Sequence, residues 1–315
     1  MKEFLITKDN EGQRFDKYLA RIIGGGGMSF IFKMLRKKNF VLNDKKATGK
    51  EVLKAGDTVK LYIADDTYEK FKSELKDIDL NNISFDLEDK IVYEDKDIIL
   101  VNKPANLLSQ KADINDISLN EIVLDYLLKK GEVTKESLLQ YKPSCVNRLD
   151  RNTTGIIIVA KSLRAAQAIS SSLKDRTINK YYKCIVEGRF SKEGLYKGYL
   201  TKDDNNNTVK ITDEAISEIS SYIETEYKCL KSYDNVSEVE VHLITGKPHQ
   251  IRAHISNLGF PIIGDRKYGK QNVNSRFKAK NQLLHAYKVV FPEYEASYEF
   301  VFSGKTFVCE PKFRY

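Results

Sequence analysis

The sequence predicts an α+β protein of two domains, a small one at the N-terminus and a larger one built mainly of β-strands. Three observations support this prediction. The chain has 315 residues, which exceeds the usual size of one domain. Residues 14–38 show helical periodicity, and short strand-like segments follow them. Strand patterns dominate after residue 90. We therefore expect domains at residues 1–66 and 90–315, joined by an acidic linker at 67–89.

The composition is that of an ordinary globular chain. It is 41% hydrophobic and 30% charged, with 17 Gly and 6 Pro, which excludes disordered, collagen-like and low-complexity proteins. No apolar run approaches the roughly 18 residues of a membrane span, and the first residues lack the apolar core of a signal peptide. We expect a cytoplasmic protein without a membrane segment. The four cysteines lack C-x-x-C spacing, which argues against a zinc knuckle, a redox pair or a disulfide framework.

The positive charge is concentrated in one part of the chain. The net charge is +8, and the window Gln13–Lys50 alone carries +8, with ten basic and two acidic residues. The remainder of the chain therefore sums to zero. The segment Asp65–Asp97 has the opposite sign, with twelve acids and five lysines. A basic module followed by an acidic stretch indicates a polyanionic partner such as RNA for the N-terminal part.

Two helices begin the basic module. The first is predicted between Arg14 and Ile23, where apolar residues recur at helical spacing, and Gly24 to Gly27 should end it. The second has Ser29 as its expected N-cap. The apolar faces of the two helices are Phe15, Tyr18, Leu19, Ile22 and Ile23, and then Ile31, Met34 and Leu35.

Two short strands complete the predicted module. They are Phe40–Leu42, followed by a turn at Asn43-Asp44, and Thr58–Tyr62. Together with the helices, the segments Gln13–Ala20, Leu35–Ala47 and Lys54–Leu61 resemble the S-four-like RNA-binding domain. The resemblance and the local charge make candidate RNA contacts of the basic residues Arg14, Lys33, Arg36, Lys37 and Lys38. The alternative interpretation of these side chains is a solvated helix face.

In the larger domain, a hairpin is expected first. Its strands are Lys90–Asp95 and Ile98–Pro104. A helix capped by Ser118 and ended by Gly131 should follow. Further expected elements are a buried strand at Ile156–Ala160, a helix with Leu163, Ala166, Ile169 and Leu173 on one face, and strands at Tyr222–Leu230, Glu238–Ile244 and Leu283–Phe291.

A polar loop enters the buried strand and contains one candidate catalytic carboxylate. Asp150 stands between Arg148 and Arg151, and guanidinium neighbours favour an ionised carboxylate. Such an aspartate can serve as a nucleophile, a base or an electrostatic stabiliser. On composition alone, a salt-bridged surface turn is the stronger interpretation of this cluster, because surface ion pairs are common.

Residues 147–162, Asn-Arg-Leu-Asp-Arg-Asn-Thr-Thr-Gly-Ile-Ile-Ile-Val-Ala-Lys-Ser, are similar to the signature of the large-subunit-ribosomal family of RNA pseudouridine synthases. Three further blocks resemble that family in the same order: Val101–Leu107, Lys180–Gly188 and Thr245–His254. In all, the resemblance covers residues 13–315. It implies a mixed, mainly antiparallel sheet with flanking helices and a central cleft for RNA.

The resemblance also implies an enzyme, an isomerase that converts specific uridines of RNA to pseudouridine without a cofactor. Large-subunit ribosomal RNA is the expected substrate. By the same resemblance, Asp150 is the catalytic aspartate, Tyr182 stacks beside the base and acts as general base, and Arg252 pairs with the carboxylate. Arg148 should fill the place of the extruded base. Further expected RNA or substrate contacts are Arg151, Lys103, Lys247, His249 and Gln250.

Other functions remain open at this point. They are a non-catalytic RNA-binding protein on the same fold, a pseudouridine synthase directed at transfer RNA, and a hydrolase with paired carboxylates. The hydrolase needs a second acid near Asp150, where the sequence offers arginines. The spacing of His249 and His254 does not place both on one helix face, so no metal site is expected. We expect a monomer, with no protein partner evident.

Overall fold

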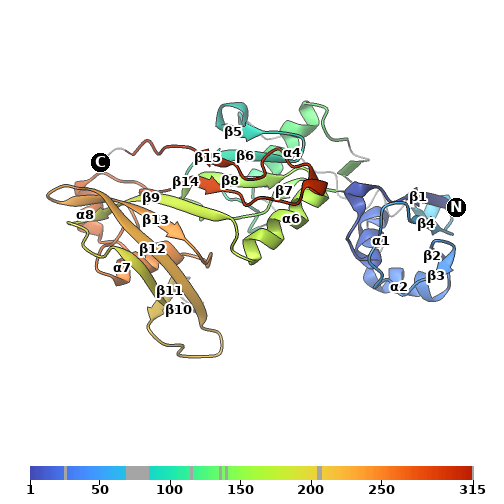
Figure 1. Cartoon of the computed structure of the whole chain (residues 1–315), viewed down its shortest axis with the longest axis horizontal. Helices are drawn as coiled ribbons and strands as arrows, with labels where there is room; N and C mark the ends of the chain where they lie inside the picture. The colour runs from blue at the N-terminus through green and yellow to red at the C-terminus, as the bar shows by residue number, and fades with distance from the viewer. Residues whose placement is uncertain are drawn as a thin grey trace. The chain divides into compact units, whose positions relative to one another are not determined.

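The computed structural model describes residues 1–24, 27–68, 85–113, 116–134, 137–138, 141–203 and 208–313. Most of the predicted acidic linker, residues 69–84, lies outside these ranges. The chain forms two compact units (Figure 1). The first unit contains Met1–Phe85, Glu121–Ser144 and Ala160–Ala168, and the second contains the remaining residues. Because the first unit includes segments from beyond residue 90, the predicted domain limits stay a prediction.

The N-terminal segment of the first unit, Met1–Phe85, contains a small antiparallel sheet and two helices, α1 and α2, among its described residues. Its strands follow the order β1-β4-β2-β3. Their bounds are β1 (Lys2–Leu5), β2 (Phe40–Leu42), β3 (Lys45–Lys46) and β4 (Thr58–Leu61), and the helices are α1 (Phe15–Ile23) and α2 (Met28–Arg36), with a short 3-10 turn, η1 (Lys8–Asn10). The strand β1 was not predicted, because its four residues alternate between half-buried and exposed and carry little apolar signal.

The helix α1 follows the prediction closely. All five predicted apolar positions are buried, and the helix ends at Gly24, whose φ of 69° closes it with an N–H donated to the carbonyl of Ala20. The expected N-cap of α2 is wrong. That helix begins at Met28 after Gly27, so Ser29 lies within its first turn and no side chain caps it.

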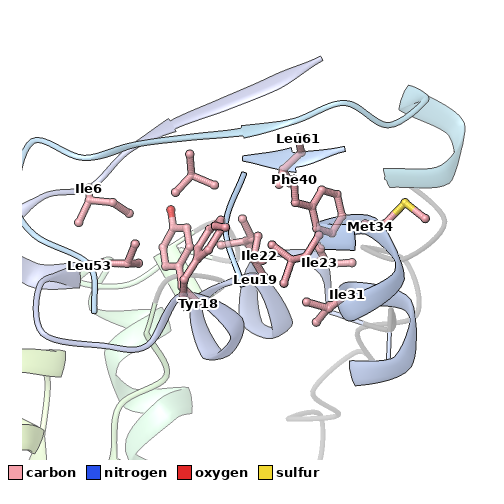
Figure 2. Packing of buried hydrophobic residues seen from close by; sticks show 14 of the residues in the cluster. Ile6, Tyr18, Leu19, Ile22, Ile23, Ile31, Met34, Phe40, Leu53 and Leu61 are labelled. Atoms are coloured by element: carbon pink, nitrogen blue, oxygen red, sulfur yellow. The ribbon is translucent and has the colours of Figure 1, made fainter. Parts of the chain in front are cut away.

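Side chains from both helices meet the sheet in one hydrophobic cluster. Figure 2 shows Leu19 and Ile23 of α1 and Ile31 of α2 directed toward Phe40 and Leu61 of the strands. These five side chains are almost completely buried. The predicted turn after β2 is also present, with positive φ angles at Asn43 and Asp44. Local periodicity therefore predicted both helices, their core faces and two of the four strands, β2 and β4.

The second unit contains most of a large sheet that has eleven strands among the described residues. Nine strands follow the order β11-β10-β12-β13-β9-β14-β8-β6-β5, while β15 pairs with β14 and β7 with β8 (Figure 1). The strand bounds are β5 (Ile91–Glu94), β6 (Ile98–Lys103), β7 (Ser144–Cys145), β8 (Thr154–Ala160), β9 (Asn179–Glu187), β10 (Gly194–Asp203), β11 (Thr208–Thr212), β12 (Ser221–Ser232), β13 (Val236–Leu243), β14 (Leu284–Val290) and β15 (Thr306–Val308).

Further helices follow along the chain. They are α4 (Leu119–Lys129), α6 (Leu163–Lys174), α7 (Gln250–Asn257) and α8 (Gln271–Arg276), with 3-10 turns η2 (Glu88–Lys90) and η3 (Ala296–Tyr298). Residues 121–129 of α4 and 163–168 of α6 belong to the first unit. Within the described ranges, no helix combines the length and apolarity that a bilayer crossing requires.

The strand pairing confirms the predicted fold class. β5 pairs antiparallel with β6, β10 with β11 and β12, β12 with β13, β13 with β9, and β14 with β9 and β15, whereas β14 and β8 run parallel. The buried run β8 thus lies inside the sheet next to β14, as a strand that is apolar on both faces should. The sequence did not reveal β10, β11, α7 or α8, because their patterns are mostly polar.

Candidate active site

A cleft of about 1020 Å³ opens in the second unit at the loop that enters β8. Its walls come from residues 108–110, 146–153, 173–182, 243–252, 266–267 and 282–284. Nine basic side chains line it: Arg148, Arg151, Lys174, Arg176, Lys180, Lys247, Arg252, Arg266 and Lys267. Asp150 is the one acidic residue among the described lining residues. A cleft with this balance attracts a polyanion and presents a single carboxylate to it.

The loop that carries Asp150 is fixed by hydrogen bonds on both sides of that residue. The Ser109 hydroxyl donates to the carbonyl of Leu149 at 3.0 Å and accepts from its N–H at 3.1 Å. After Asp150 the chain turns sharply, and the N–H of Thr153 donates to the Asp150 carbonyl at 3.0 Å. Earlier in the loop, Asn147 Oδ1 accepts the N–H of Ile158 at 2.7 Å. The carboxylate therefore stands on a rigid backbone, with its side chain 26% exposed to the cleft.

Lys103 is bonded to the same loop inside the protein, and the prediction that it contacts RNA is wrong. Its side chain is completely buried. Its ammonium donates to the carbonyls of Pro104 and Leu107, each at 2.8 Å, and of Arg151 at 3.0 Å. These bonds join the end of β6 to the residue after Asp150. Lys103 thus positions the loop, and its three donors are used within the protein.

Gly155 lets the catalytic loop enter the sheet. It has a φ of 110°, and a Cβ at this position would lie 2.3 Å from the Ala286 carbonyl oxygen of β14. Only glycine permits this approach. Next to it, the Thr154 hydroxyl lies 2.7 Å from His285 Nδ1, while His285 Nε2 lies 2.9 Å from the carbonyl of Cys309. Because a carbonyl can only accept, Nε2 carries the proton and Thr154 donates to Nδ1.

The carboxylate of Asp150 is paired with Arg252 from α7. Arg252 Nη1 donates to Asp150 Oδ2 at 2.6 Å. The other edge of the guanidinium forms a fork with Asp265, from Nε at 2.7 Å and from Nη2 at 2.9 Å. Asp265 is completely buried and also accepts the backbone N–H groups of Lys267 and Tyr268. Arg252 is therefore oriented by one buried carboxylate and presents its remaining donors to the second.

These contacts control the protonation state of the guanidinium. Burial acts to lower the pKa of Arg252, but the hydrogen bonds and charge of Asp265, and then the charge of Asp150, raise it above its ordinary value. Burial works against the charged form of Asp265 as well, yet bonding to Arg252 lowers the pKa of that carboxyl. The bonding to Asp265 thus keeps the guanidinium of Arg252 protonated beside Asp150.

The helix α7 is held against the sheet by the packing of Ala253 and by the hydrogen bonds of Gln250. Ala253 packs with Leu200, Val209 and Ile223 on the sheet. Gln250 is buried, and its amide bonds to Thr245, to the N–H of Lys247, to the Glu224 carbonyl and to Thr225, so that both ends of the amide are occupied. The expected RNA contact of Gln250 is therefore wrong, and this side chain anchors the start of the helix.

His249 lies at the N-terminus of α7 in the left-handed conformation, with a φ of 55°. The N–H of Val209 donates to the Tyr268 hydroxyl, which lies 2.9 Å from His249 Nδ1. The other ring nitrogen of His249, Nε2, lies 3.9 Å from Asp150 Oδ2. Burial lowers the pKa of His249, although Asp150 opposes this effect. A neutral imidazole thus faces the carboxylate.

Tyr182 lines the cleft from β9, where it pairs with Val241 and Ala286 of the neighbouring strands. The side chain is 5% exposed. Burial, and secondarily the charge of Asp150, raise the pKa of Tyr182 well above its ordinary value. A protonated phenol is therefore the stable form, which opposes the phenolate that a general base requires.

The arginines beside Asp150 in the sequence do not form its ion pair. Arg148 and Arg151 are exposed at the cleft wall, and within the described chain neither makes an ion pair with that carboxylate. The cation that bonds to Asp150 is Arg252, as the family resemblance implied. Lys247 is also exposed at the wall.

The predicted cations of the N-terminal unit lie on its surface. Lys33, Arg36, Lys37 and Lys38 are exposed on and after α2. Arg14 pairs with the buried Asp16 at 2.5 Å, with half of the arginine side chain exposed. The structure thus presents these cations to solvent, in a form that permits contact with phosphates.

Sequence reasoning assigned no role to three residues that build the site, Asp265, Ser109 and Tyr268, although Asp265 and Tyr268 lie in segments that resemble the same family. Asp265 follows Gly264, 13 residues after Arg252 in the sequence. Nothing in this local sequence indicated that its carboxylate bonds to Arg252. Ser109 has no neighbouring signal at all. A carboxylate held by a cation at the floor of a basic cleft can attack an electrophilic carbon, remove a proton or stabilise a developing positive charge.

Comparisons with known proteins agree with this chemistry. A sequence model of the family described as RNA pseudouridylate synthase matches residues 97–257. An uncharacterized RNA pseudouridine synthase of Mycoplasma genitalium is 32% identical over 94% of this chain and 90% of its own. A ribosomal large subunit pseudouridine synthase C of Rickettsia felis is 32% identical over 94% and 96%. The solved human RNA pseudouridylate synthase domain containing 4 shares the fold, with a TM-score of 0.56 and 23% identity over 72% of this chain and 90% of the human one.

Proposed function

This chain belongs to the RNA pseudouridylate synthase family, and from that premise we propose that Asp150 is the carboxylate with which it acts on uridine. The protein is an RNA pseudouridine synthase, which is an isomerase, and RNA is its substrate. The observation that carries the proposal is the bonding of Asp150 to Arg252, which Asp265 holds in turn, at the floor of a cleft lined by cations.

The reaction needs one nucleophilic or basic group and no external electrons. The bond between the ribose anomeric carbon and N1 of uracil breaks, the base rotates, and a bond forms to C5, whose proton is then lost while N1 gains one. Asp150 can attack the anomeric carbon, attack the uracil ring or assist elimination to a glycal. Each route uses an unprotonated carboxylate that faces the substrate, as the exposed oxygen of Asp150 does.

The neighbouring side chains have different proposed roles. Tyr182 packs its neutral ring beside the uracil, since burial disfavours its phenolate. Arg252 and the imidazole of His249 steady the charge of Asp150 as it changes during the reaction. Arg148, which is exposed at the cleft wall, enters the space left by the extruded nucleotide, where a planar cation can both stack and donate hydrogen bonds.

The substrate within RNA is proposed from the relatives and from the N-terminal unit. The relatives from Rickettsia felis and Vibrio parahaemolyticus are named for the large ribosomal subunit. We therefore propose large-subunit ribosomal RNA as the substrate and the cytoplasm as the place of action. The first unit is proposed to be an S-four-like RNA-binding domain, because two helices pack on a small sheet and present exposed cations on α2.

The experiment that tests the carboxylate is the substitution Asp150→Asn. Wild-type protein should release tritium from RNA that contains 5-tritiated uridine, whereas the variant should release none and still bind the RNA. The amide keeps the shape of the side chain but cannot act as nucleophile or base. Full activity of Asp150→Asn would eliminate the assignment. Mapping pseudouridines after incubation with ribosomal or transfer RNA transcripts identifies the substrate, and modification of transfer RNA alone would overturn the ribosomal proposal.

A further inference from the structure

Basic residues in the connection between α6 and β9 also line the cleft. The proposed chemistry assigns no role to them. Lys174, Arg176 and Lys180 lie within seven positions of one another, and all three line the cleft that holds Asp150. Lys174 ends α6, and Lys180 is the second residue of β9. Because alternate residues of a strand share a face, Lys180 lies on the same face of β9 as Tyr182.

Lys180 is a half-buried cation that has no partner among the described residues. In the part of the chain that the structure describes, no hydrogen bond or ion pair is made by its ammonium. Burial lowers the pKa of Lys180, and no neighbouring carboxylate opposes this effect. The ammonium lies beside Gly246, where a Cβ would be 3.4 Å from Lys180 Nζ, an ordinary contact distance. A buried ammonium that faces a cleft needs an anion from the ligand.

Arg176 follows the end of α6 and lines the cleft. Its φ of 61° is the left-handed conformation that commonly ends a helix, and the N–H of Thr177 donates to the Ser172 carbonyl at 2.9 Å. Its guanidinium lies 3.6 Å from Glu224 Oε2. That carboxylate also lies 3.5 Å from Lys197 and accepts the Tyr222 hydroxyl at 2.8 Å. Arg176 is therefore weakly held and exposed.

We propose that Lys180 and Arg176 form a phosphate subsite that grips the RNA backbone beside the target uridine. This inference rests on the proposed function of the cleft. The argument is charge balance, because the only acid among the described lining residues is Asp150, which is already bonded to Arg252. A backbone phosphate brings the missing negative charge, whereas a uracil carbonyl brings none. Contacts at this point supply part of the energy that nucleotide extrusion costs.

The first test removes the cation and compares it with a matched loss of charge elsewhere. Lys180→Met should raise KM for RNA about tenfold, with kcat changed less than about twofold, since a charged hydrogen bond to phosphate is lost. The slope of log affinity against log salt should become shallower by about 0.7, the value for one phosphate on a single strand. Lys228→Met is the control, because Lys228 is exposed on β12 and does not line the cleft.

The second test removes the phosphate charge. Two RNAs carry one uncharged methylphosphonate linkage, either 5′ or 3′ of the target uridine. With wild-type enzyme, one of them should lose about as much affinity as Lys180→Met does, and the variant should lose little more on that RNA. Lys180→Arg, which keeps the charge, should retain the sensitivity to that linkage and serves if the methionine variant does not fold.

The outcomes separate the two proposals. Wild-type protein without tritium release on any RNA overturns the proposed function. If the wild-type enzyme is active, two results would overturn the subsite. The first is a Lys180→Met variant that has the same KM and salt dependence as Lys228→Met. The second is a loss of RNA affinity from Lys180→Met that adds in full to the loss from each of the two neutral linkages.

Discussion

The substitution Asp265→Asn tests how the site is held together. Asp265 is completely buried and forks the guanidinium of Arg252 at 2.7 and 2.9 Å, while Arg252 reaches Asp150 at 2.6 Å. Asparagine has nearly the same shape but lacks the negative charge and one acceptor. The variant should leave Arg252 with a single carboxylate partner and free it to rotate away from its present orientation.

The expected magnitude follows from burial. Removal of one member of a buried ion pair costs about 3 to 5 kcal/mol of unfolding free energy. Because Arg252 retains Asp150, the lower end, about 3 kcal/mol, applies here. For a domain of this size, each kcal/mol lowers Tm by about 2 to 4 °C, so the expected decrease is roughly 6 to 12 °C. Displacement of the guanidinium by about 1 Å should reduce kcat between about tenfold and 100-fold.

The control is the same chemical change in an exposed pair. Asp234 bonds to Arg189 at 2.8 Å, but these side chains are 86% and 73% exposed. Asp234→Asn should therefore change the unfolding free energy by less than about 1 kcal/mol and leave kcat unchanged. Thermal unfolding and tritium release from 5-tritiated uridine RNA measure both quantities. If the two variants lose equal stability, or if Asp265→Asn retains full kcat, the reasoning is refuted.

Three more predictions concern the frame around the site. Burial lowers the pKa of His254 to about 4 from 6.5, so the unfolded chain binds more protons between these values and unfolding free energy falls as pH decreases through this window. His254→Gln should make this slope shallower by up to about 1.4 kcal/mol per pH unit in urea unfolding; equal slopes would contradict the assignment. Ser109→Ala leaves both backbone groups of Leu149 unpaired and should cost about 1 to 3 kcal/mol with a lower kcat, whereas unchanged stability would argue against the role of the hydroxyl. Gly155→Ala should yield little folded protein, because the new Cβ would lie 2.3 Å from the Ala286 carbonyl, and normal yield with wild-type Tm would disprove the steric argument.

Local periodicity predicted much of the fold. The apolar spacing of α1 and α2 gave the buried faces of both helices, and the continuous run of β8 gave a strand inside the sheet. Such patterns succeed because burial repeats every 3.6 residues in a helix and every second residue in a strand. The same rule explains the failures. The mostly polar segments of β10 and α7 carry no comparable repeat, and their pairing and packing come from the rest of the sheet.

The sequence identified Asp150, and the family resemblance supplied its partner Arg252, 102 residues further along the chain, which the structure confirms. The arginines near Asp150 in the sequence suggested a local ion pair instead, and the described residues show none between them and that carboxylate. Lys103 was expected at the RNA and instead donates to three carbonyls inside the protein. Composition reports which charges exist but not which of them face inward. Which charges face inward depends on which strands and helices are neighbours in the folded protein.

The chain by itself determined where the helices and most strands form, which residues are apolar enough to be buried, and which loop carries the aspartate. Only the tertiary structure decided that Asp265 orients the guanidinium of Arg252, and that Lys180 faces the cleft with no hydrogen bond or ion pair among the described residues. The physical reason is range. Periodicity reflects interactions over a few residues, while an ion pair needs two groups within about 4 Å, and only the folded sheet brings such distant segments together.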